Sequence, residues 1–307
     1  MLWFILALCG PLLWSFVNHI DKYILSRHLR GGGVGALIIF SCLFSIVIIP
    51  ILIYLRPQFI LVDLLDGAAL LLGGILSAVG MLLYLLALQK EEASKIVPLF
   101  QLSPVIALIF GYFIFKETIT VTQSVGVIVI LFGAMIISMK RDINFSNRIQ
   151  INWRPLILMS GSSICFIFHA ILFKIGAIGE NDFWLGLLWE HIGILFTGVF
   201  LFVFIGSLRR DFLNLFRFNS FPILSLNFLG EVFVLVGNAC TAYAFLIVQV
   251  GLVLVVSAYQ PLFVFIIGII LTYAFPKILK EDVSPRALVN KGIAVVVIIV
   301  GSFLING

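Results

Sequence analysis

Long apolar runs without charged residues recur throughout this chain, and they constrain its fold more than any other feature. Of the 307 residues, 62% are hydrophobic and 11% are charged, and the mean hydropathy is +1.23. Soluble domains carry about 25% charged residues, and a soluble protein this apolar would expose large patches that aggregate. We therefore expect an all-α integral membrane protein.

Ten segments of the sequence approach the roughly 20 mostly apolar residues that a helix needs to cross a bilayer. They are 2–20, 33–55, 67–88, 96–115, 121–139, 155–173, 183–206, 223–248, 251–273 and 292–305. The break near Gln249 is the weakest, because no charge marks it. The first run lacks a basic region before it and a small-residue cleavage pattern after it, so we interpret it as a retained helix and not as a signal peptide.

The polar stretch 140–154 divides the ten segments into two sets of five, over residues 1–139 and 155–307. Pro104 and Pro261 each follow an alanine by 17 residues and precede a glycine by 7 residues. In the first segment of each half, an aromatic residue precedes a lysine by 8 residues: Trp14 and Lys22 in the first half, and Phe166 and Lys174 in the second. Because five is odd, two homologous halves would enter the membrane in opposite directions. The sequence thus predicts two inverted five-helix repeats, with a substrate site between them near the midplane.

Positive charge is distributed unequally between the loops. Sixteen of the 19 Lys and Arg residues lie in loops after odd-numbered segments, and three lie after even-numbered ones. The positive-inside rule places the odd-numbered loops in the cytoplasm and both termini outside. We expect a multi-pass protein of the plasma membrane, the inner membrane in a bacterium.

Several classes of function are disfavoured by the composition. The positive residues sit in short clusters between apolar runs, which argues against a nucleic-acid partner. Cysteines lie inside apolar runs without paired spacing, so we expect neither disulfides nor a metal site; they are Cys9, Cys42, Cys165 and Cys240. The sequence has no metalloprotease, nucleophile-elbow or P-loop motif. We therefore expect no enzyme and no cofactor, and any uphill transport would use an ion gradient or exchange.

The stretch "LYLLALQKEEASKIVPLFQLSPVIALIFGYFIFKE" (83–117) resembles the repeat of EamA-type transporters in the drug/metabolite transporter superfamily. The matching landmarks are Ala87, Ala93, Ser94, Pro104, Gly111 and Glu117. The stretch "LWSFVNHIDK" resembles the first helix of that family through Trp14 and Lys22. The second half departs from the pattern, because Val250 and Gly251 replace Ala-Ser and the acidic residue is displaced to Glu281. The resemblance implies a transporter with ten helices but does not identify a substrate. Its usual picture has cytoplasmic termini, opposite to the charge count.

Glu231 is the leading candidate for a functional residue, since ionisable groups deep in a span usually serve function. It lies 8 residues into the eighth segment, roughly 12 Å along a helix. Asn227, Asn238 and Thr241 share about 80° of arc with it. This polar stripe predicts a cavity face, and a hydrogen-bonded seam between helices is the structural alternative.

Two further titratable groups are candidates for proton coupling beside Glu231. Glu190 lies 7 residues into the seventh segment, and the adjacent His191 is expected to be structural. His169 in the sixth segment has an ordinary pKa of about 6.5 that suits proton exchange. For both Glu190 and His169, the alternative is a structural group whose hydrogen bonds are made within the protein.

The remaining candidates divide into pocket and gate residues. We expect a substrate pocket that combines aromatic and hydrogen-bonding groups; beyond His169, Asn227, Glu231 and Asn238, its candidates are Trp14, Asn18, Tyr84, Gln101, Tyr259 and Gln260. At the ends of helices we expect gate or interface residues, namely Asp21, Lys22 and Lys174. Gly126, Gly133, Gly292 and Gly301 are expected to serve close helix packing.

Together these features predict a secondary transporter that moves a small zwitterion, amine or amphipathic metabolite, in exchange for protons and in the direction of export. A flippase for a lipid-linked head group or carrier lipid is one alternative. An intramembrane enzyme or non-transporting assembly protein is another. Partners are expected to be a small-molecule or lipid substrate and membrane lipids; the sequence does not indicate an oligomeric state.

Overall fold

The computed structural model describes residues 2–27, 33–55, 63–89, 103–138, 153–177, 183–217, 221–274 and 285–306. All regular structure in these ranges is helical. Before residue 140 the helices are α1 (Leu2–Arg27), α2 (Val34–Leu55), α3 (Leu64–Leu88), α5 (Ser103–Phe115) and α6 (Val121–Ser138). After residue 152 they are α7 (Trp153–Ala177), α8 (Phe183–Phe204), α9 (Gly206–Arg217), α10 (Phe221–Ile247), α11 (Val250–Val256), η1 (Ser257–Tyr259), α12 (Gln260–Ala274) and α13 (Pro285–Asn306).

Seven helical segments in the described part of the chain are long and apolar enough to cross a membrane, which confirms an all-helical, multi-pass membrane protein. They include the combined segment Val250–Ala274. The fourth, fifth and tenth predicted segments are represented by shorter apolar helices, Ile106–Phe115, Val121–Gly133 and Val295–Ile305. Every predicted segment therefore contains a helix in its described part, while the number of ten crossings stays a prediction.

Two boundaries differ from the prediction, and a third agrees with it. Helix α1 continues to Arg27, so Asp21 lies within the helix, at the end of its apolar span. The ninth segment is not one continuous helix, because the 3-10 turn Ser257–Tyr259 separates α11 from α12. The weak break at Gln249 is confirmed, since α10 ends at Ile247 and α11 begins at Val250.

Helix α9 was not expected, because its charged residues resemble a loop. Leu208 and Phe212 face the protein and pack in one apolar cluster with residues of α2, whereas Arg209 and Arg210 are exposed. Apolar residues four apart lie on the same side of a helix. These two arginines therefore lie on a short helix in the connection between α8 and α10, outside the apolar spans.

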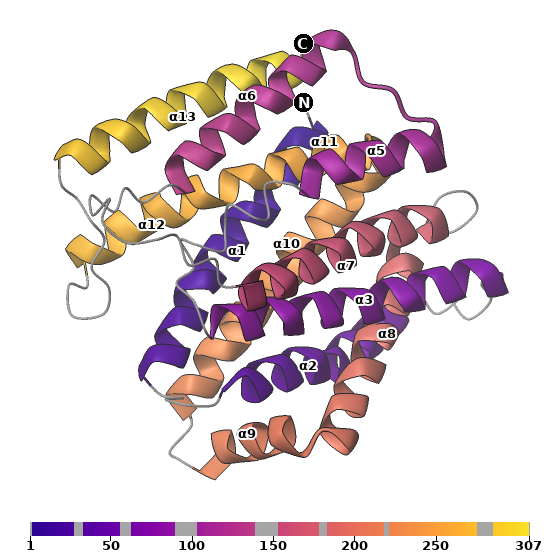
Figure 1. The fold of residues 1–307 in the computed structure, drawn as a ribbon. Coiled ribbons are helices and arrows are strands. Elements are labelled where there is room, and N and C mark those ends of the chain that lie inside the picture. Colours follow the sequence, from indigo (N-terminus) through magenta and orange to yellow (C-terminus); the bar gives the residue numbers. More distant parts are fainter. Residues whose placement is uncertain are drawn as a thin grey trace.

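The most extensive helix pairings all join a helix before residue 140 to one after residue 152. Helix α3 packs along α7, α6 along α13, and α1 along α10; α8 packs against both α2 and α3. Figure 1 shows α6 and α13 side by side at one edge of the molecule, with α2, α8 and α9 toward the opposite edge. The two parts of the chain thus interlock and do not pack as separate bodies.

Close helix contacts depend on residues without a side chain. A Cβ atom on Gly126 would lie 2.9 Å from the Gly301 carbonyl oxygen, so the predicted role of these two glycines in packing α6 against α13 is confirmed. The same prediction for Gly292 is wrong, since no described atom lies within 4 Å of its Cβ position.

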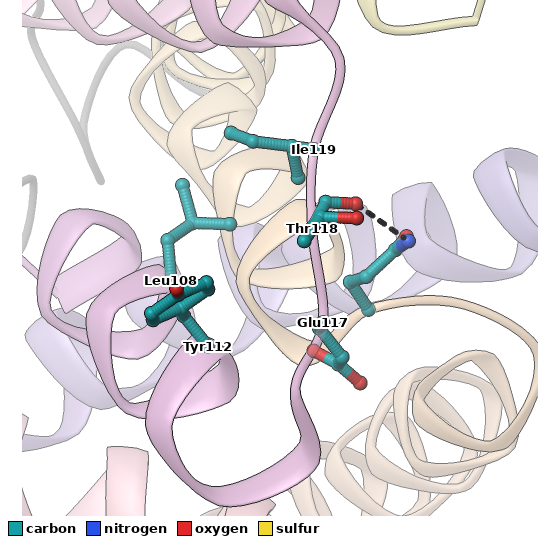
Figure 2. Close-up of a pocket in the computed structure, with 6 residues that line it drawn as sticks. Leu108, Tyr112, Glu117, Thr118 and Ile119 are labelled. Atoms are coloured by element: carbon teal, nitrogen blue, oxygen red, sulfur yellow. Dashed lines mark hydrogen bonds between the residues drawn. The ribbon is translucent and has the colours of Figure 1, made fainter.

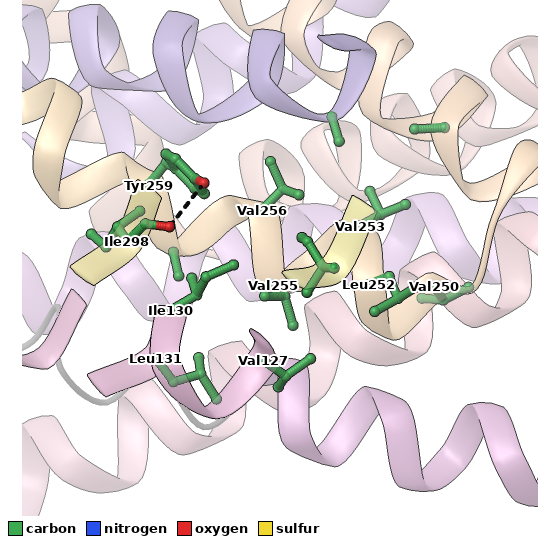
Figure 3. Packing of buried hydrophobic residues seen from close by; sticks show 14 of the residues in the cluster. Val127, Ile130, Leu131, Val250, Leu252, Val253, Val255, Val256, Tyr259 and Ile298 are labelled. Carbon is green, nitrogen blue, oxygen red and sulfur yellow. Dashed lines mark hydrogen bonds between the residues drawn. The ribbon is translucent and has the colours of Figure 1, made fainter. Parts of the chain in front are cut away.

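The largest apolar cluster surrounds the broken ninth segment. Val255 and Val256 of α11 are fully buried, and Val127 and Ile130 of α6 pack in the same cluster (Figure 3). Lipid chains are as apolar as these side chains, so close packing rather than transfer from water stabilises such contacts. The cluster holds α11 of the second part of the chain against α1 and α6 of the first part.

Candidate substrate site

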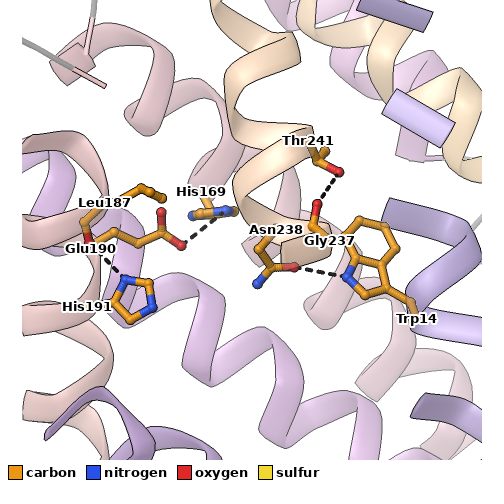
Figure 4. A network of polar contacts seen from close by, with 8 residues as sticks. All are labelled: Trp14, His169, Leu187, Glu190, His191, Gly237, Asn238 and Thr241. Atoms are coloured by element: carbon orange, nitrogen blue, oxygen red, sulfur yellow. Dashed lines mark hydrogen bonds and ion pairs between the residues drawn. The ribbon is translucent and has the colours of Figure 1, made fainter. Parts of the chain in front are cut away.

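Trp14 and Asn238 meet where α1 crosses α10. The Trp14 indole Nε1 donates a hydrogen bond to Asn238 Oδ1 at 2.9 Å (Figure 4). A Cβ atom on Gly237 would lie 3.1 Å from Trp14 Nε1 and 3.4 Å from Gly10 Cα. The small residues therefore let the two backbones approach closely and leave space for the indole. The structure brings together two residues that the sequence analysis placed in one pocket.

Glu231 lies farther toward the start of α10 and is held by α2. Ser41 Oγ donates a hydrogen bond to Glu231 Oε1. Asp21 of α1 interacts electrostatically with both Glu231 and Tyr84. The Tyr84 hydroxyl donates to Asn18 Oδ1 at 3.4 Å. We call these five residues from four helices the Glu231 cluster.

Asn227 lies one helical turn before Glu231, on the same side of α10. Its side chain is buried, with 4% of the residue exposed, and its Nδ2 has no hydrogen-bond partner among the described residues. Buried polar groups are nearly always hydrogen-bonded. The Asn227 amide is therefore a buried donor that is available to a further acceptor.

Negative charge in the Glu231 cluster has no described countercharge. Neither Asp21 nor Glu231 forms an ion pair with any Lys or Arg whose side chain the structure describes. Tyr84 of the cluster packs against buried apolar side chains that include Ile24 and Leu85. An ionised carboxylate is costly in such surroundings unless a cation accompanies it.

His169 and Glu190 form a second titratable pair, between α7 and α8. His169 Nε2 lies 3.9 Å from Glu190 Oε1, and the Glu190 side chain is 3% exposed. In Figure 4 the His169 ring lies between Glu190 and Asn238. His191 is not part of the pair, because its Nδ1 lies 2.8 Å from the Leu187 carbonyl oxygen of its own helix. The arrangement agrees with a structural role for His191.

Lys174 joins three elements at the far end of α7. Its Nζ lies 2.6 Å from Glu117 Oε1 and 2.9 Å from the carbonyl oxygen of Val248, where α10 ends. Glu117 and Gln249 also line a cavity of about 260 Å³ (Figure 2), with Leu108, Tyr112, Thr118 and Ile119. The geometry suits an interface residue, as the sequence analysis expected for Lys174.

The structure does not bring every predicted pocket residue to the Glu231 cluster. The Tyr259 hydroxyl donates to the Ile298 carbonyl oxygen at 3.4 Å, and its ring packs in the apolar cluster around α11. Gln260 accepts a hydrogen bond from Ser15 Oγ at 3.2 Å, through its backbone carbonyl. Gln101 and the side chain of Lys22 lie outside the described residues. Their predicted roles stay predictions.

Ser41 is the member of the site that sequence reasoning missed. It is one of several small residues in the apolar run of α2, and nothing in its neighbourhood distinguishes it from a packing residue. Glu117 appeared only as a landmark of the repeat. Its pairing with Lys174 depends on contacts between segments 57 residues apart, which spacing cannot reveal.

The first part of the chain is similar to a known protein family. Residues 1–139 match the model of the EamA-like transporter family. The match covers 139 of the 307 residues. The EamA match confirms the resemblance carried by the 83–117 stretch.

Two further similarities concern a relative and a solved structure. The uncharacterized protein MJ1333.1 of Methanocaldococcus jannaschii is 34% identical over 68 residues, which are 22% of this chain and 50% of that protein. The chain thus spans about half the length of this relative. A crystal structure with 13% sequence identity superposes with a TM-score of 0.61 and covers 98% of this chain and 95% of its own. At this identity the likeness shows the fold alone.

Proposed function

We propose that this EamA-type protein is a secondary transporter that works by alternating access between two inverted five-helix halves, 1–139 and 155–307. The observation that carries the proposal is Glu231, a carboxylate inside the helix assembly that is held by Ser41 of the opposite half. Ionisable residues within membrane spans usually mark substrate or ion pathways.

Equivalent contacts in the two halves support an inverted repeat. Gly10 of α1 approaches Gly237 of α10, and Ser162 of α7 donates to the Gly80 carbonyl oxygen of α3 at 2.8 Å. Ser162 follows Gly10 by 152 residues, the separation of Trp14 from Phe166, and Gly237 follows Gly80 by 157 residues, that of the landmark prolines. If each residue is replaced by its equivalent in the other half, the contact between α1 and α10 therefore becomes the contact between α7 and α3.

The same exchange reveals an asymmetry that suits alternating access. Helices α3 and α8 pack closely, because Gly74 contacts the Glu190 carbonyl oxygen and Gly193 contacts that of Leu71. The equivalent helices, α10 and α2, pack much less extensively. There, Glu231 and Ser41 stand at the positions of Gly74 and Gly193. We propose that transport separates α3 from α8 while α2 closes on α10.

Proton exchange at Glu231 would couple this movement to a gradient. Because an ionised carboxylate there lacks a described countercharge, its charge is compensated when either a proton or a cationic group binds. Such mutually exclusive binding is the requirement for exchange. We propose export of a small zwitterion, amine or amphipathic metabolite across the plasma membrane, with His169 and Glu190 as the second proton-carrying pair.

Proteoliposomes with a trapped pH indicator test this proposal. Addition of a transported compound from a panel of amines, amino acids and nucleosides should release protons from the vesicles, and Glu231→Gln should abolish that release. Asp211→Asn on α9 is the matched carboxylate control and should retain it. Full proton movement in Glu231→Gln would refute the coupling role. Scrambling of labelled lipid without proton movement would favour the flippase.

A further inference from the structure

We infer that the Glu231 cluster selects organic cations, meaning compounds with an ammonium group and a neutral hydrogen-bond acceptor but without a carboxylate. This inference narrows the substrate class of the proposed transporter and rests on that function for its transport role. Its claim about binding rests on the charges and contacts of the cluster itself.

The first argument is charge. Asp21 of α1 and Glu231 of α10 are two carboxylic acids that interact electrostatically. The hydroxyl of Ser41 is the hydrogen-bond donor to Glu231, and no described Lys or Arg forms an ion pair with either acid. One ammonium group and one proton would neutralise both carboxylates. A zwitterion would bring a third carboxylate into the same apolar surroundings, where an uncompensated charge is costly.

The second argument is the unpartnered amide of Asn227. Its Nδ2 is a buried donor without a described partner, one helical turn from Glu231. A neutral amide offers a carboxylate much less stabilisation than a charged donor does. A hydroxyl or carbonyl oxygen of a cationic ligand would satisfy the amide without adding negative charge. The pairing of two acids with one amide donor therefore fits an ammonium compound that carries a neutral oxygen.

Aromatic groups complete the site. Tyr84 lies within electrostatic range of Asp21 and bonds Asn18, and Trp14 lies one turn from Asn18 on α1. Aromatic faces attract ammonium groups, and most strongly when both are desolvated. Such surfaces add affinity for a cation without requiring a second polar group on it.

The same ammonium group occurs in free amines and in ethanolamine-type lipid head groups, whose phosphate would have to stay outside the Glu231 cluster. Because α2 and α10 pack less extensively than α3 and α8, we place the entry for a ligand from either source between α2 and α10. The test therefore compares protein in nanodiscs made with phosphatidylethanolamine and protein in nanodiscs made with phosphatidylglycerol alone. If phosphatidylethanolamine weakens amine binding by competition, the natural ligand is a lipid head group and the inference on ammonium chemistry stands.

Calorimetric titration of the full-length protein with matched ligands tests the inference. Phenethylamine and phenylalanine differ only in the carboxylate, and octopamine adds two hydroxyl groups to phenethylamine, one on the ring and one on the carbon beside it. We expect phenethylamine to bind at least 10-fold more tightly than phenylalanine, and octopamine more tightly still. Glu231→Gln should weaken phenethylamine binding at least 10-fold. Asn227→Leu should remove the advantage of octopamine and leave phenethylamine binding largely unchanged.

Two outcomes would overturn the inference. One is phenylalanine binding as tightly as phenethylamine, and the other is no detectable binding of either amine. If Glu231→Gln elutes as aggregate in size-exclusion chromatography, the variant Ser41→Ala is used in its place. Ser41→Ala retains the Glu231 carboxylate but removes the hydroxyl that donates to it, so the affinity for amines should change. Amines that bind with the expected preference but are not carried into proteoliposomes would refute the proposed function alone.

Discussion

Lys174 and Glu117 form an ion pair, with 2.6 Å between Nζ and Oε1, that connects the second half of the chain to the first. Glu117 follows α5 of the first half, and Lys174 lies in the last turn of α7 of the second. Their side chains are 15% and 10% exposed, so water screens the pair only weakly. The pair therefore ties the two halves together at one end of the helix assembly.

Removing one partner of this pair should destabilise the protein. Lys174→Met leaves Glu117 partly buried without its cation, and we expect a loss of about 2–4 kcal/mol in the free energy of unfolding. Thermal unfolding in detergent measures it. The double variant Glu117→Lys/Lys174→Glu should recover part of the loss, and not all of it, because a glutamate cannot donate to the Val248 carbonyl oxygen. An unchanged unfolding temperature in Lys174→Met would show that the pair contributes nothing.

The glycine contact between α3 and α8 predicts a second effect. A methyl group at Gly74 or Gly193 would collide with a backbone carbonyl of the facing helix, so each alanine substitution should cost about 1–3 kcal/mol. Gly292→Ala is the matched control, because its Cβ position is open, and alanine favours helix by up to about 1 kcal/mol. Equal unfolding temperatures for Gly74→Ala and Gly292→Ala would contradict the close contact.

The hydrogen bond between Trp14 and Asn238 can be measured by a double-mutant cycle. Trp14→Phe and Asn238→Leu each remove it, and we expect a coupling energy of about 0.6–1 kcal/mol, as for other hydrogen bonds between membrane helices. Purely additive effects of the two changes would mean that the bond is not formed in the membrane.

Orientation can be tested at α9, where Ser207 is exposed beside Arg209 and Arg210. The charge distribution predicts that this helix faces the cytoplasm. In a variant without native cysteines, Ser207→Cys should therefore resist a membrane-impermeant maleimide in intact cells and react in inverted vesicles. Reaction in intact cells would place α9 outside and reverse the predicted orientation.

Hydropathy was sufficient to predict the membrane class and the positions of the helices, because crossing a bilayer demands a long uncharged run. It failed at α9, where charged residues hid the two apolar side chains that pack near α2. It failed also at Ser257–Tyr259, since a 3-10 turn inside a buried apolar run leaves the hydropathy unchanged. In both cases the decisive interactions are with other helices.

The candidate site shows a similar division. Glu231, Trp14 and Asn238 were recognisable because polar or amphipathic groups in an apolar helix are costly without a purpose. Their partners were less predictable: Ser41 is a small residue that occurs in any membrane helix, and the approach of His169 to Glu190 depends on how α7 and α8 cross. The sequence indicates which residues need partners, and only the tertiary structure identifies them.

The interlocked helix pairs also bear on how the chain is assembled. Since α1 packs along α10, α3 along α7 and α6 along α13, the peptide connection through residues 140–152 is not what holds the halves together. Two polypeptides cut within this connection and synthesised in the same cell should find each other and yield a functional heterodimer, whereas either fragment alone should be degraded. A gene encoding the protein could thus be split at this point without loss of the assembled molecule.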